Sequence, residues 1–269
     1  MRVEFIKMHG LGNDFVVLDA RSQDLPPPDA ATARAIADRH TGVGCDQLLH
    51  LSPSDRADVR MRIYNPDGGE VGACGNAARA VALLIGRDCR IETADRILDV
   101  SLSDGGAKVD MGPPAFAWDA IPLAYAMDTA AMPVGWDMLE EPGAANVGNP
   151  HVIFFVDDCD AVPLETLGPL IESDPLFPER VNVNVATIES EDRIRLRVWE
   201  RGAGLTRACG TGACATAVAA IRRRLVRSPV TVALPGGALE IAWSAGGSIQ
   251  MSGPAKESFR GTFEWSDFS

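Results

Sequence analysis

The chain alternates between segments with the two-residue period of β-strands and segments with helical periodicity. Alternation of apolar and polar residues indicates strands at 2–8, 15–19, 59–65, 97–102, 151–156, 180–187 and 193–200. Helical patterns occur at 29–40, 77–85, 163–172 and 213–221. Strands and helices are thus mixed in both halves of the chain, which predicts an α+β (mixed α/β) fold.

Two of the expected helices carry apolar or small residues around nearly their whole circumference. They are 77–85 and 213–221. A helix of this kind must be buried on all sides, and a curled sheet is the simplest container for it. We therefore expect two pseudo-symmetric domains, each a curled, mostly antiparallel sheet wrapped around one central buried helix.

An internal repeat connects these two helices. The phrase ACGNAARAVA from Ala73 returns as ACGTGACATA from Ala208, so that Cys74 and Cys209 lie 135 positions apart. The preceding strands RMRIYN (60–65) and RLRVWE (195–200) align at the same spacing, as do Gly69 with Gly204 and Gln47 with Asn182. The repeat predicts two equivalent lobes that face one cleft.

Proline and glycine mark the boundaries between these lobes. The segment Met111-Gly112-Pro113-Pro114 is the strongest internal breaker. We expect an N-terminal lobe at 1–113 and a C-terminal lobe at 114–255, with the active site in the cleft between them. Pro254 marks a second crossing, after which 256–269 is expected to return to the first lobe, with a strand near 258–265.

Composition narrows the class of protein. The chain has 269 residues, a formal net charge of −12 and a pI near 4.8. Such a charge argues against nucleic acid or anionic lipid as a partner. The apolar runs are too short for a membrane span and no signal-peptide pattern is present, so we expect a cytoplasmic protein. Six cysteines without CxxC spacing indicate reduced thiols rather than a disulfide framework or a metal site.

The duplicated Cys-Gly at a helix start suggests proton transfer by the two thiol groups. A thiol there lies beside unpaired backbone N–H groups, which favour a thiolate and also bind carboxylates. Two such helix starts could hold one amino-acid carboxylate, with a sulfur above and a sulfur below the α-carbon. One thiolate would remove the α-proton while the opposite thiol donates another, so that the configuration inverts without a cofactor.

Seven blocks of the sequence carry a resemblance to a known family. They are MHGLGNDF from Met8, GVGCDQLL from Gly42, YNPDGGEVGACGN from Tyr64, VGNPH from Val147, FPERVN from Phe177, WERGAGLTRACGTGACA from Trp199 and LPGG from Leu234. These blocks resemble the diaminopimelate epimerases, which are cofactor-independent enzymes of lysine and peptidoglycan-precursor synthesis. They run nearly end to end, so the resemblance implies epimerisation of LL- to meso-diaminopimelate.

The resemblance also implies roles for individual residues. Cys74 and Cys209 are the acid/base thiols, and His151 and Glu200 assist their proton handling. The backbone N–H groups that hold the reacting carboxylate belong to Gly75, Asn76, Gly210 and Thr211. Glu200 also meets the reacting ammonium group. The carboxylate far from the reacting carbon, here called the distal carboxylate, is held by Asn65, Asn149, Asn182 and Arg201. Asn13 and Gln47 complete the polar lining.

Several alternatives remain open at this point. Proline racemases and hydroxyproline epimerases share the two-cysteine, duplicated design, and the isomerases of the phenazine-biosynthesis type use a carboxylate instead. A non-catalytic amino-acid-binding homologue would keep the polar lining and do no chemistry. The expected partner is a small-molecule substrate, and the resemblance alone implies a homodimer.

Overall fold

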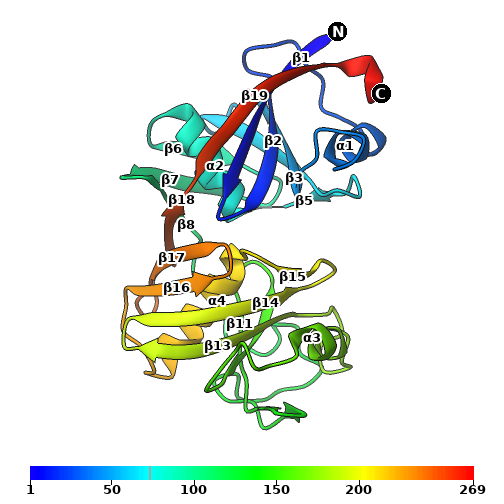
Figure 1. The fold of residues 1–269 in the computed structure, drawn as a ribbon. Helices are drawn as coiled ribbons and strands as arrows, with labels where there is room; N and C mark the ends of the chain where they lie inside the picture. Colours follow the sequence, from blue (N-terminus) through cyan, green and yellow to red (C-terminus); the bar gives the residue numbers. More distant parts are fainter. Residues whose placement is uncertain (73) are drawn as a thin grey trace. The chain divides into compact units, whose positions relative to one another are not determined.

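The computed structural model describes residues 1–72 and 74–269; Ala73, which opens the first copy of the repeated phrase, lies outside them. The chain divides into two compact units, which we call unit 1 (Met1–Val109 with Gly253–Ser269) and unit 2 (Asp110–Ser252). Figure 1 labels the helices and strands of both units.

Unit 1 consists of short strands and α-helices. Its strands are β1 (Arg2–Gly10), β2 (Asn13–Asp19), β3 (Gln47–Ser52), β4 (Val59–Tyr64), β5 (Glu70–Val71), β6 (Cys89–Glu92), β7 (Ile97–Ser103), β8 (Gly106–Asp110) and β19 (Lys256–Glu264). Its helices are α1 (Ala30–Ala37) and α2 (Gly75–Ile85), with a 3-10 turn, η1 (Trp265–Asp267), at the end. The chain returns to this unit within β18 (Gln250–Pro254).

The sheet of unit 1 has the order β19–β1–β2–β3–β4–β6–β7–β8, with β5 beside the end of β4. The pairs β2–β3 and β4–β6 are parallel, and the other pairs are antiparallel. The strand β19 pairs with β1 from Arg2↔Glu264 to His9↔Lys256, so the C-terminal strand completes the sheet that the N-terminus begins.

Unit 2 repeats the arrangement of β1 to β8, without a counterpart of β19 among the described residues. Its strands are β9 (Gly135–Trp136), β10 (Leu139–Glu140), β11 (Gly143–Asn146), β12 (Pro150–Phe155), β13 (Asn182–Ser190), β14 (Arg193–Glu200), β15 (Gly204–Thr206), β16 (Val230–Leu234) and β17 (Gly237–Ala242), and its helices are α3 (Leu164–Glu172) and α4 (Gly210–Arg222). The order is β11–β12–β13–β14–β16–β17–β18, and its parallel pairs β12–β13 and β14–β16 correspond to β2–β3 and β4–β6 of unit 1. The repeat seen in the sequence is therefore a repeat of topology.

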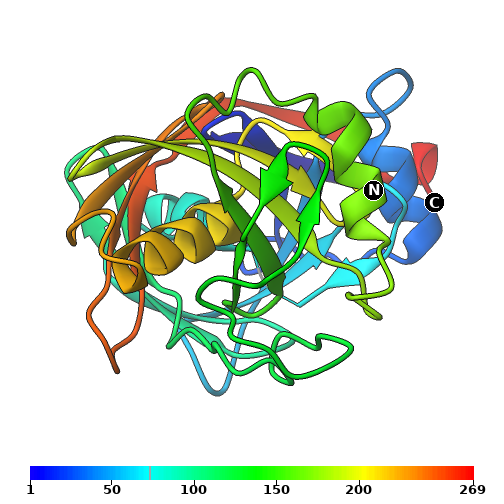
Figure 2. The ribbon, with the colours of Figure 1, turned by 90° about the horizontal axis from the view of Figure 1, so that it is seen from below.

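One helix in each unit is enclosed by strands of its own sheet. The helix α2 contacts β1, β6, β7 and β19, and α4 contacts β11 to β14, β16 and β17. Figure 2 shows α4 lying lengthwise within its strands. All of 75–82 and 212–220 are buried. The expected α+β fold, with a mostly antiparallel sheet around a central helix in each half, is confirmed.

The central helix of unit 1 is not as apolar as we expected. Arg79 lies in the middle of α2 and is the largest fully buried side chain among the described residues. A guanidinium keeps its charge in any protein environment, so it requires hydrogen-bond acceptors inside the core. This buried cation becomes important at the site below.

The helix α1 is shorter than the periodic pattern predicted. Asp29 caps its start, since the Asp29 carboxylate accepts from the Thr32 N–H at 2.8 Å. Its end is set by Asp38, whose carboxylate accepts the N–H groups of His40 and Thr41 at 2.8 and 2.7 Å. An Asp that binds the following amides in this way favours a turn over a further helical turn.

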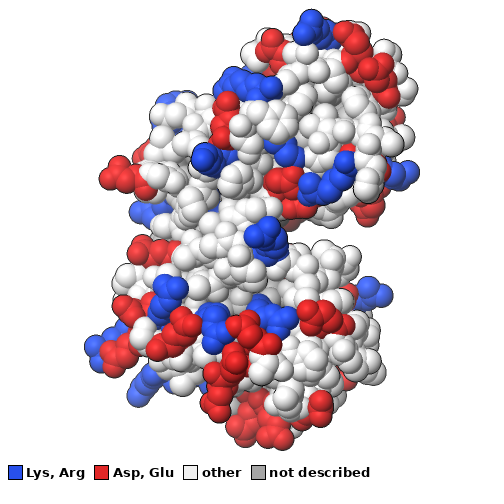
Figure 3. Space-filling model, in the orientation of Figure 1, with Lys and Arg blue, Asp and Glu red and all other residues white. Residues whose placement is uncertain are grey.

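The surface carries both signs of charge. On the face shown in Figure 3, acidic and basic side chains lie among each other. Many of them form exposed ion pairs, such as Arg193 and Arg195 with Glu189. Among the helices that the structure describes, none has the length and apolar character needed to cross a bilayer.

Candidate functional site

A tight turn places Asn13 at the start of β2. Leu11 and Gly12 join β1 to β2 and have positive φ angles of 58° and 86°, as in the two-residue turns that match the twist of a hairpin. The equivalent connection in unit 2 runs from β11 to β12, where Gly148 has φ 110° and precedes Asn149. Both asparagines thus follow a backbone conformation that glycine adopts most readily.

Cys74 caps the buried helix of unit 1. Its Sγ accepts from the Ala77 N–H at 3.4 Å, and the thiol donates to Asn13 Oδ1 at 3.9 Å. The first intrahelical hydrogen bond joins the Ala78 N–H to the Cys74 carbonyl. The N–H groups of Gly75 and Asn76 precede this bond, so they belong to the helix start that lacks intrahelical acceptors.

A chain of hydrogen bonds fixes the amides beside Cys74. Arg79 Nη2 donates to Asn76 Oδ1 at 2.8 Å, Asn76 Nδ2 donates to Asn13 Oδ1 at 3.1 Å, and Asn13 Nδ2 donates to Asp46 Oδ2 at 3.1 Å. A guanidinium only donates and a carboxylate only accepts. This series of hydrogen bonds has a donor, Arg79, at one end and an acceptor, Asp46, at the other. Each amide between them can therefore face only one way, and the Asn13 carbonyl is turned towards Cys74.

Gln47 and Asn65 form a second amide pair in unit 1. Gln47 begins β3 beside Phe15, and its Nε2 donates to Asn65 Oδ1 at 3.3 Å. The Gln47 Oε1 atom has no hydrogen-bond partner among the described residues. Asn65 follows β4 and is held by a turn in which its N–H donates to the Gly69 carbonyl at 2.8 Å. The pair therefore leaves one buried amide carbonyl, that of Gln47, without a partner among the described residues.

Cys209 is the equivalent cap in unit 2. Its Sγ accepts from the Gly212 N–H at 3.3 Å and lies 3.5 Å from Thr211 Oγ1. The Ala213 N–H donates to the Cys209 carbonyl, so the N–H groups of Gly210 and Thr211 precede the first helical hydrogen bond. The two capping cysteines differ in burial, because Cys209 is only 3% exposed whereas Cys74 is partly exposed.

The electrostatics at Cys209 favour the thiol. Burial raises the pKa of Cys209 well above its ordinary value, and the negative charge of Glu200 raises it further. The hydrogen bonds from Thr211 and from the Gly212 N–H oppose this pKa shift without outweighing it. The helix start thus favours a thiolate at Cys209 as expected, but burial and Glu200 outweigh this contribution. Glu200 is itself held by Thr206, whose Oγ1 donates to Glu200 Oε1 at 2.5 Å.

His151 lies inside unit 2 between two amides. It begins the paired part of β12 and β13 opposite Asn182 and is completely buried. Its Nε2 lies 2.9 Å from Asn149 Oδ1 and its Nδ1 lies 3.1 Å from Asn184 Nδ2. Burial lowers the pKa of His151 to about 3, and the positive charge of Arg201 also lowers it. The imidazole is therefore neutral near pH 7.

Asn182 ties the start of β13 to the turn after β14. Its Nδ2 donates to the Pro150 carbonyl at 2.8 Å, and its Oδ1 accepts from the Arg201 N–H at 3.0 Å. The exposed guanidinium of Arg201 donates to the Glu179 carbonyl at 2.9 Å. Asn182 thus uses its amide to fix the backbone from which Arg201 projects.

The inferred site residues therefore form two half-sites. The first half-site, in unit 1, comprises Asn13, Gln47, Asn65, Cys74, Gly75 and Asn76. The second half-site, in unit 2, comprises Asn149, His151, Asn182, Glu200, Arg201, Cys209, Gly210 and Thr211. Within each unit, the residues lie at the N-terminus of the central helix and at strand ends near it.

The remaining cysteines differ from the two caps. Cys45, Cys89, Cys159 and Cys214 are all buried. Burial raises the pKa of Cys45 and of Cys89 to about 11. These four side chains are small core residues.

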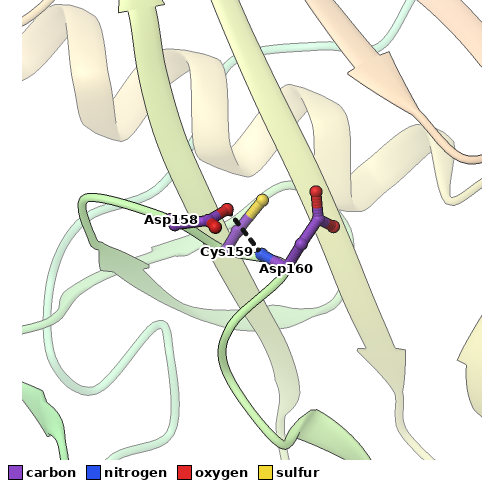
Figure 4. Close-up of side chains that lie close together, drawn as sticks. All are labelled: Asp158, Cys159 and Asp160. Atoms are coloured by element: carbon purple, nitrogen blue, oxygen red, sulfur yellow. Dashed lines mark hydrogen bonds between the residues drawn. The ribbon is translucent and has the colours of Figure 1, made fainter.

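One group among the described residues has donor atoms close enough together for a metal ion. It consists of Asp158, Cys159 and Asp160 (Figure 4). Arg195 Nη1 lies 3.2 Å from Asp158 Oδ1 and also contacts the Asp160 carboxylate. The carboxylates are thus engaged by a guanidinium, and we interpret the group as a surface ion-pair cluster.

Four residues that support the half-sites were missed in the sequence. Asp46 and Arg79 lie at the two ends of the series of side-chain hydrogen bonds beside Cys74. In unit 2, Asn184 contacts His151, and buried Glu172 accepts from the Gly202 N–H at 2.9 Å. A signal existed for Asn184, because it lies two residues after Asn182 in a strand and so shares its face.

Comparison with known proteins gives consistent results along the chain. A family model described as diaminopimelate epimerase matches residues 5–117 and 143–257. The diaminopimelate epimerase of Erythrobacter litoralis is 66% identical over 269 residues, which is the full length of both chains. That of Zymomonas mobilis is 56% identical over 270 residues, again over the full length of both.

Solved structures share the fold at low sequence identity. A phenazine biosynthesis protein of the PhzF family from Enterococcus faecalis has a TM-score of 0.73 and 15% identity, and the match covers 98% of this chain and 100% of that one. A hydroxyproline epimerase from Agrobacterium vitis, solved with trans-4-hydroxy-L-proline, has a TM-score of 0.67 and 15% identity over 97% and 92% of the chains. These structures support the two-domain α+β fold.

Proposed function

We propose that this chain, which belongs to the diaminopimelate epimerase family, is an isomerase that interconverts LL- and meso-diaminopimelate in lysine biosynthesis. The full-length identity to curated family members supports this assignment. The observation in the structure that carries it is the repeated cap, in which a cysteine begins the buried helix of each unit and its sulfur accepts from the third N–H of that helix.

The reaction needs a base on one face of the α-carbon and an acid on the other. We assign these roles to Cys74 and Cys209. The raised pKa of Cys209 supports its role as the thiol that donates a proton when Cys74 acts as the base. For the opposite substrate configuration the roles exchange. The scheme requires both sulfurs to reach one α-carbon, and it requires no electron-withdrawing cofactor.

The helix starts supply the groups that stabilise the carbanion-like transition state. The N–H groups of Gly210 and Thr211 in unit 2, and those of Gly75 and Asn76 in unit 1, precede the first helical hydrogen bonds and are suited to a carboxylate. Negative charge that builds up on this carboxylate during proton removal is stabilised by fixed dipoles. Glu200, held by Thr206, is suited to the adjacent ammonium group.

The distal carboxylate of the substrate requires donors. Asn65, Asn149 and Arg201 provide amide and guanidinium groups, and Asn182 fixes the Arg201 backbone. Asn13 and Gln47 line the first half-site, where the Gln47 carbonyl is suited to an ammonium group. A site with this many donors would reject a substrate that lacks the second carboxylate, because the donors would remain unpaired. The reaction is therefore expected to be selective for a diamino diacid.

The same proposal includes the cellular setting and the assembly. Two catalytic thiols must stay reduced, which favours the cytoplasm. A homodimer follows from the family resemblance, and light scattering of the purified protein measures it directly. The partner is the small-molecule substrate.

Isotope exchange tests the proposal. Purified protein incubated with LL-diaminopimelate in D2O should produce the meso isomer with deuterium at one α-carbon, as followed by NMR and chiral chromatography. Cys74→Ala and Cys209→Ala should each abolish epimerisation, and Cys214→Ala, at a buried cysteine outside the half-sites, is the matched control. Turnover of L-proline in place of diaminopimelate would overturn the assignment, as would binding of diaminopimelate without α-hydrogen exchange.

A further inference from the structure

We propose that Asn184 is a positioning residue that orients the substrate-binding amide of Asn149 by acting through His151. This inference rests on the proposed function, because it assigns Asn149 to the distal carboxylate. Asn184 lies in β13, is completely buried and belongs to neither half-site as inferred from the sequence.

The surroundings of Asn184 determine which way its amide faces. Its Nδ2 lies 2.9 Å from the Val152 carbonyl and 3.3 Å from the Asn182 carbonyl. Both of these atoms only accept hydrogen bonds, so the NH2 group must face them. The same Nδ2 atom lies 3.1 Å from His151 Nδ1. An N–H at His151 Nδ1 would point at this donor group, so His151 Nδ1 must be the unprotonated nitrogen of the ring.

The tautomer of His151 determines how the Asn149 amide is oriented. A neutral imidazole without a proton on Nδ1 carries it on Nε2, and this N–H donates to Asn149 Oδ1 at 2.9 Å. The Asn149 carbonyl is therefore bound to the ring, and its NH2 group is turned away from the ring. An NH2 group in this orientation is a donor, as a carboxylate ligand requires.

The packing around Asn184 supports a role for its NH2 group. Its Oδ1 atom is buried and has no hydrogen-bond partner among the described residues. A Cβ atom added at Gly212 would lie 2.7 Å from this Oδ1 and 3.2 Å from Cys209 Sγ, so the carbonyl packs against the start of α4. A buried carbonyl without a partner costs free energy that a leucine would avoid. An amide at this position is therefore explained by the hydrogen bonds that its nitrogen donates.

The tautomer of His151 can be measured in the unaltered protein. The chain has four histidines, so 15N-labelled histidine gives few ring signals in long-range 1H–15N spectra. One ring, assigned by its loss in His151→Gln, should show an unprotonated Nδ1 and a protonated Nε2, and it should not titrate between pH 7 and pH 5. A protonated Nδ1, or an imidazolium in this range, would overturn the proposal.

A double-mutant cycle tests whether Asn184 acts through Asn149. Asn184→Leu should raise the KM for LL-diaminopimelate about tenfold, as expected for loss of one buried hydrogen bond, with a smaller change in kcat. In an Asn149→Ala background the same substitution should change KM less than about twofold, since the group on which it acts is gone. Thr187→Val is the matched control, because it removes a buried hydrogen bond from the same strand.

The outcomes of these experiments can be separated from one another. Equal effects of Asn184→Leu in both backgrounds would show that Asn184 only stabilises the fold and would refute the positioning role. If Asn184→Leu does not fold, the tautomer measurement decides alone. If the unaltered protein does not epimerise diaminopimelate, the proposed function fails, whereas the state of the His151 ring is still measured.

Discussion

The buried imidazole of His151 should make unit 2 sensitive to acid. In the folded protein, burial lowers the pKa of His151 from 6.5 to about 3. The positive charge of Arg201 also lowers this pKa. In the unfolded chain the same imidazole is exposed and titrates near its ordinary value.

The sign and size of the effect follow from proton binding in the two states. Between pH 6.5 and pH 3 the unfolded chain binds a proton at His151 and the folded chain does not, so the free energy of unfolding falls as the pH falls. Each pH unit in this window corresponds to about 1.4 kcal/mol. Lowering the pH from 7 to 5 spans 1.5 units of the window, and His151 alone should therefore remove about 2 kcal/mol.

Urea unfolding measures this contribution. Trp118, Trp136, Trp199 and Trp243 all lie in unit 2, so tryptophan fluorescence reports mainly on the relevant unit. Between pH 7 and pH 5, the unaltered protein should lose about 2 kcal/mol more than His151→Gln, because the other titrating groups are common to both proteins.

A control uses a second buried histidine. The pKa of His50 is also lowered by burial, but His50 lies in unit 1. His50→Gln should leave the acid-induced loss seen for unit 2 unchanged. Equal losses in the unaltered protein and in His151→Gln would refute the argument, because they would show that the folded protein accommodates an imidazolium at this position.

Three further predictions test the surroundings of the two thiols. Gly212→Ala should lower kcat/KM about 100-fold, because the added methyl group lies 2.7 Å from a buried amide oxygen and displaces groups beside the Cys209 thiol. In the same assay Gly143→Ala should behave like the unaltered protein, because its added methyl group lies 3.5 Å from the nearest neighbouring atom. Arg79→Lys should lower the free energy of unfolding by about 3 kcal/mol in urea titrations; an unchanged value would show that a lysine meets the same acceptors. Mild oxidation should join Cys74 to Cys209 in a disulfide and stop turnover reversibly. If peptide mass spectrometry finds both thiols reduced in the inactivated protein, the two sulfurs do not reach the same α-carbon of the substrate.

The elements with a strong periodic pattern were predictable from the sequence. The strand β14 has the predicted bounds, and α2 and α4 begin directly after the duplicated cysteines. Short strands such as β5 and β15 were not predicted. They contain two and three residues, so no period can be seen within them, and their pairing with β4 and β14 is a tertiary effect.

The candidate site was predictable only where residues carry recognisable motifs. The capping cysteines stood out through their repeat, but the groups that hold their neighbours did not. Arg79 was hidden in a helix otherwise made mostly of small and apolar residues, and its hydrogen bond to Asn76 arises from the orientation of both side chains within one turn of α2. Asp46 is joined to Asn13 across 33 residues of sequence. The contact between Asp46 and Asn13 depends on the assembled sheet, which a local pattern does not describe.

The two capping cysteines lie in different electrostatic environments, although the two units share one topology. Asn65 and Glu200 occupy equivalent positions in the repeat, and so do Arg79 and Cys214. Unit 1 therefore has a buried guanidinium, which stabilises anions nearby, where unit 2 has a buried cysteine. Unit 2 has a carboxylate beside its capping cysteine where unit 1 has an amide, and this carboxylate helps to keep the proton on that sulfur. A two-base epimerase must begin each turnover with one thiol and one thiolate. Under the proposed mechanism, the carboxylate of unit 2 favours the thiol at Cys209 at the stage where Cys74 acts as the base, although a cysteine caps the central helix in both units.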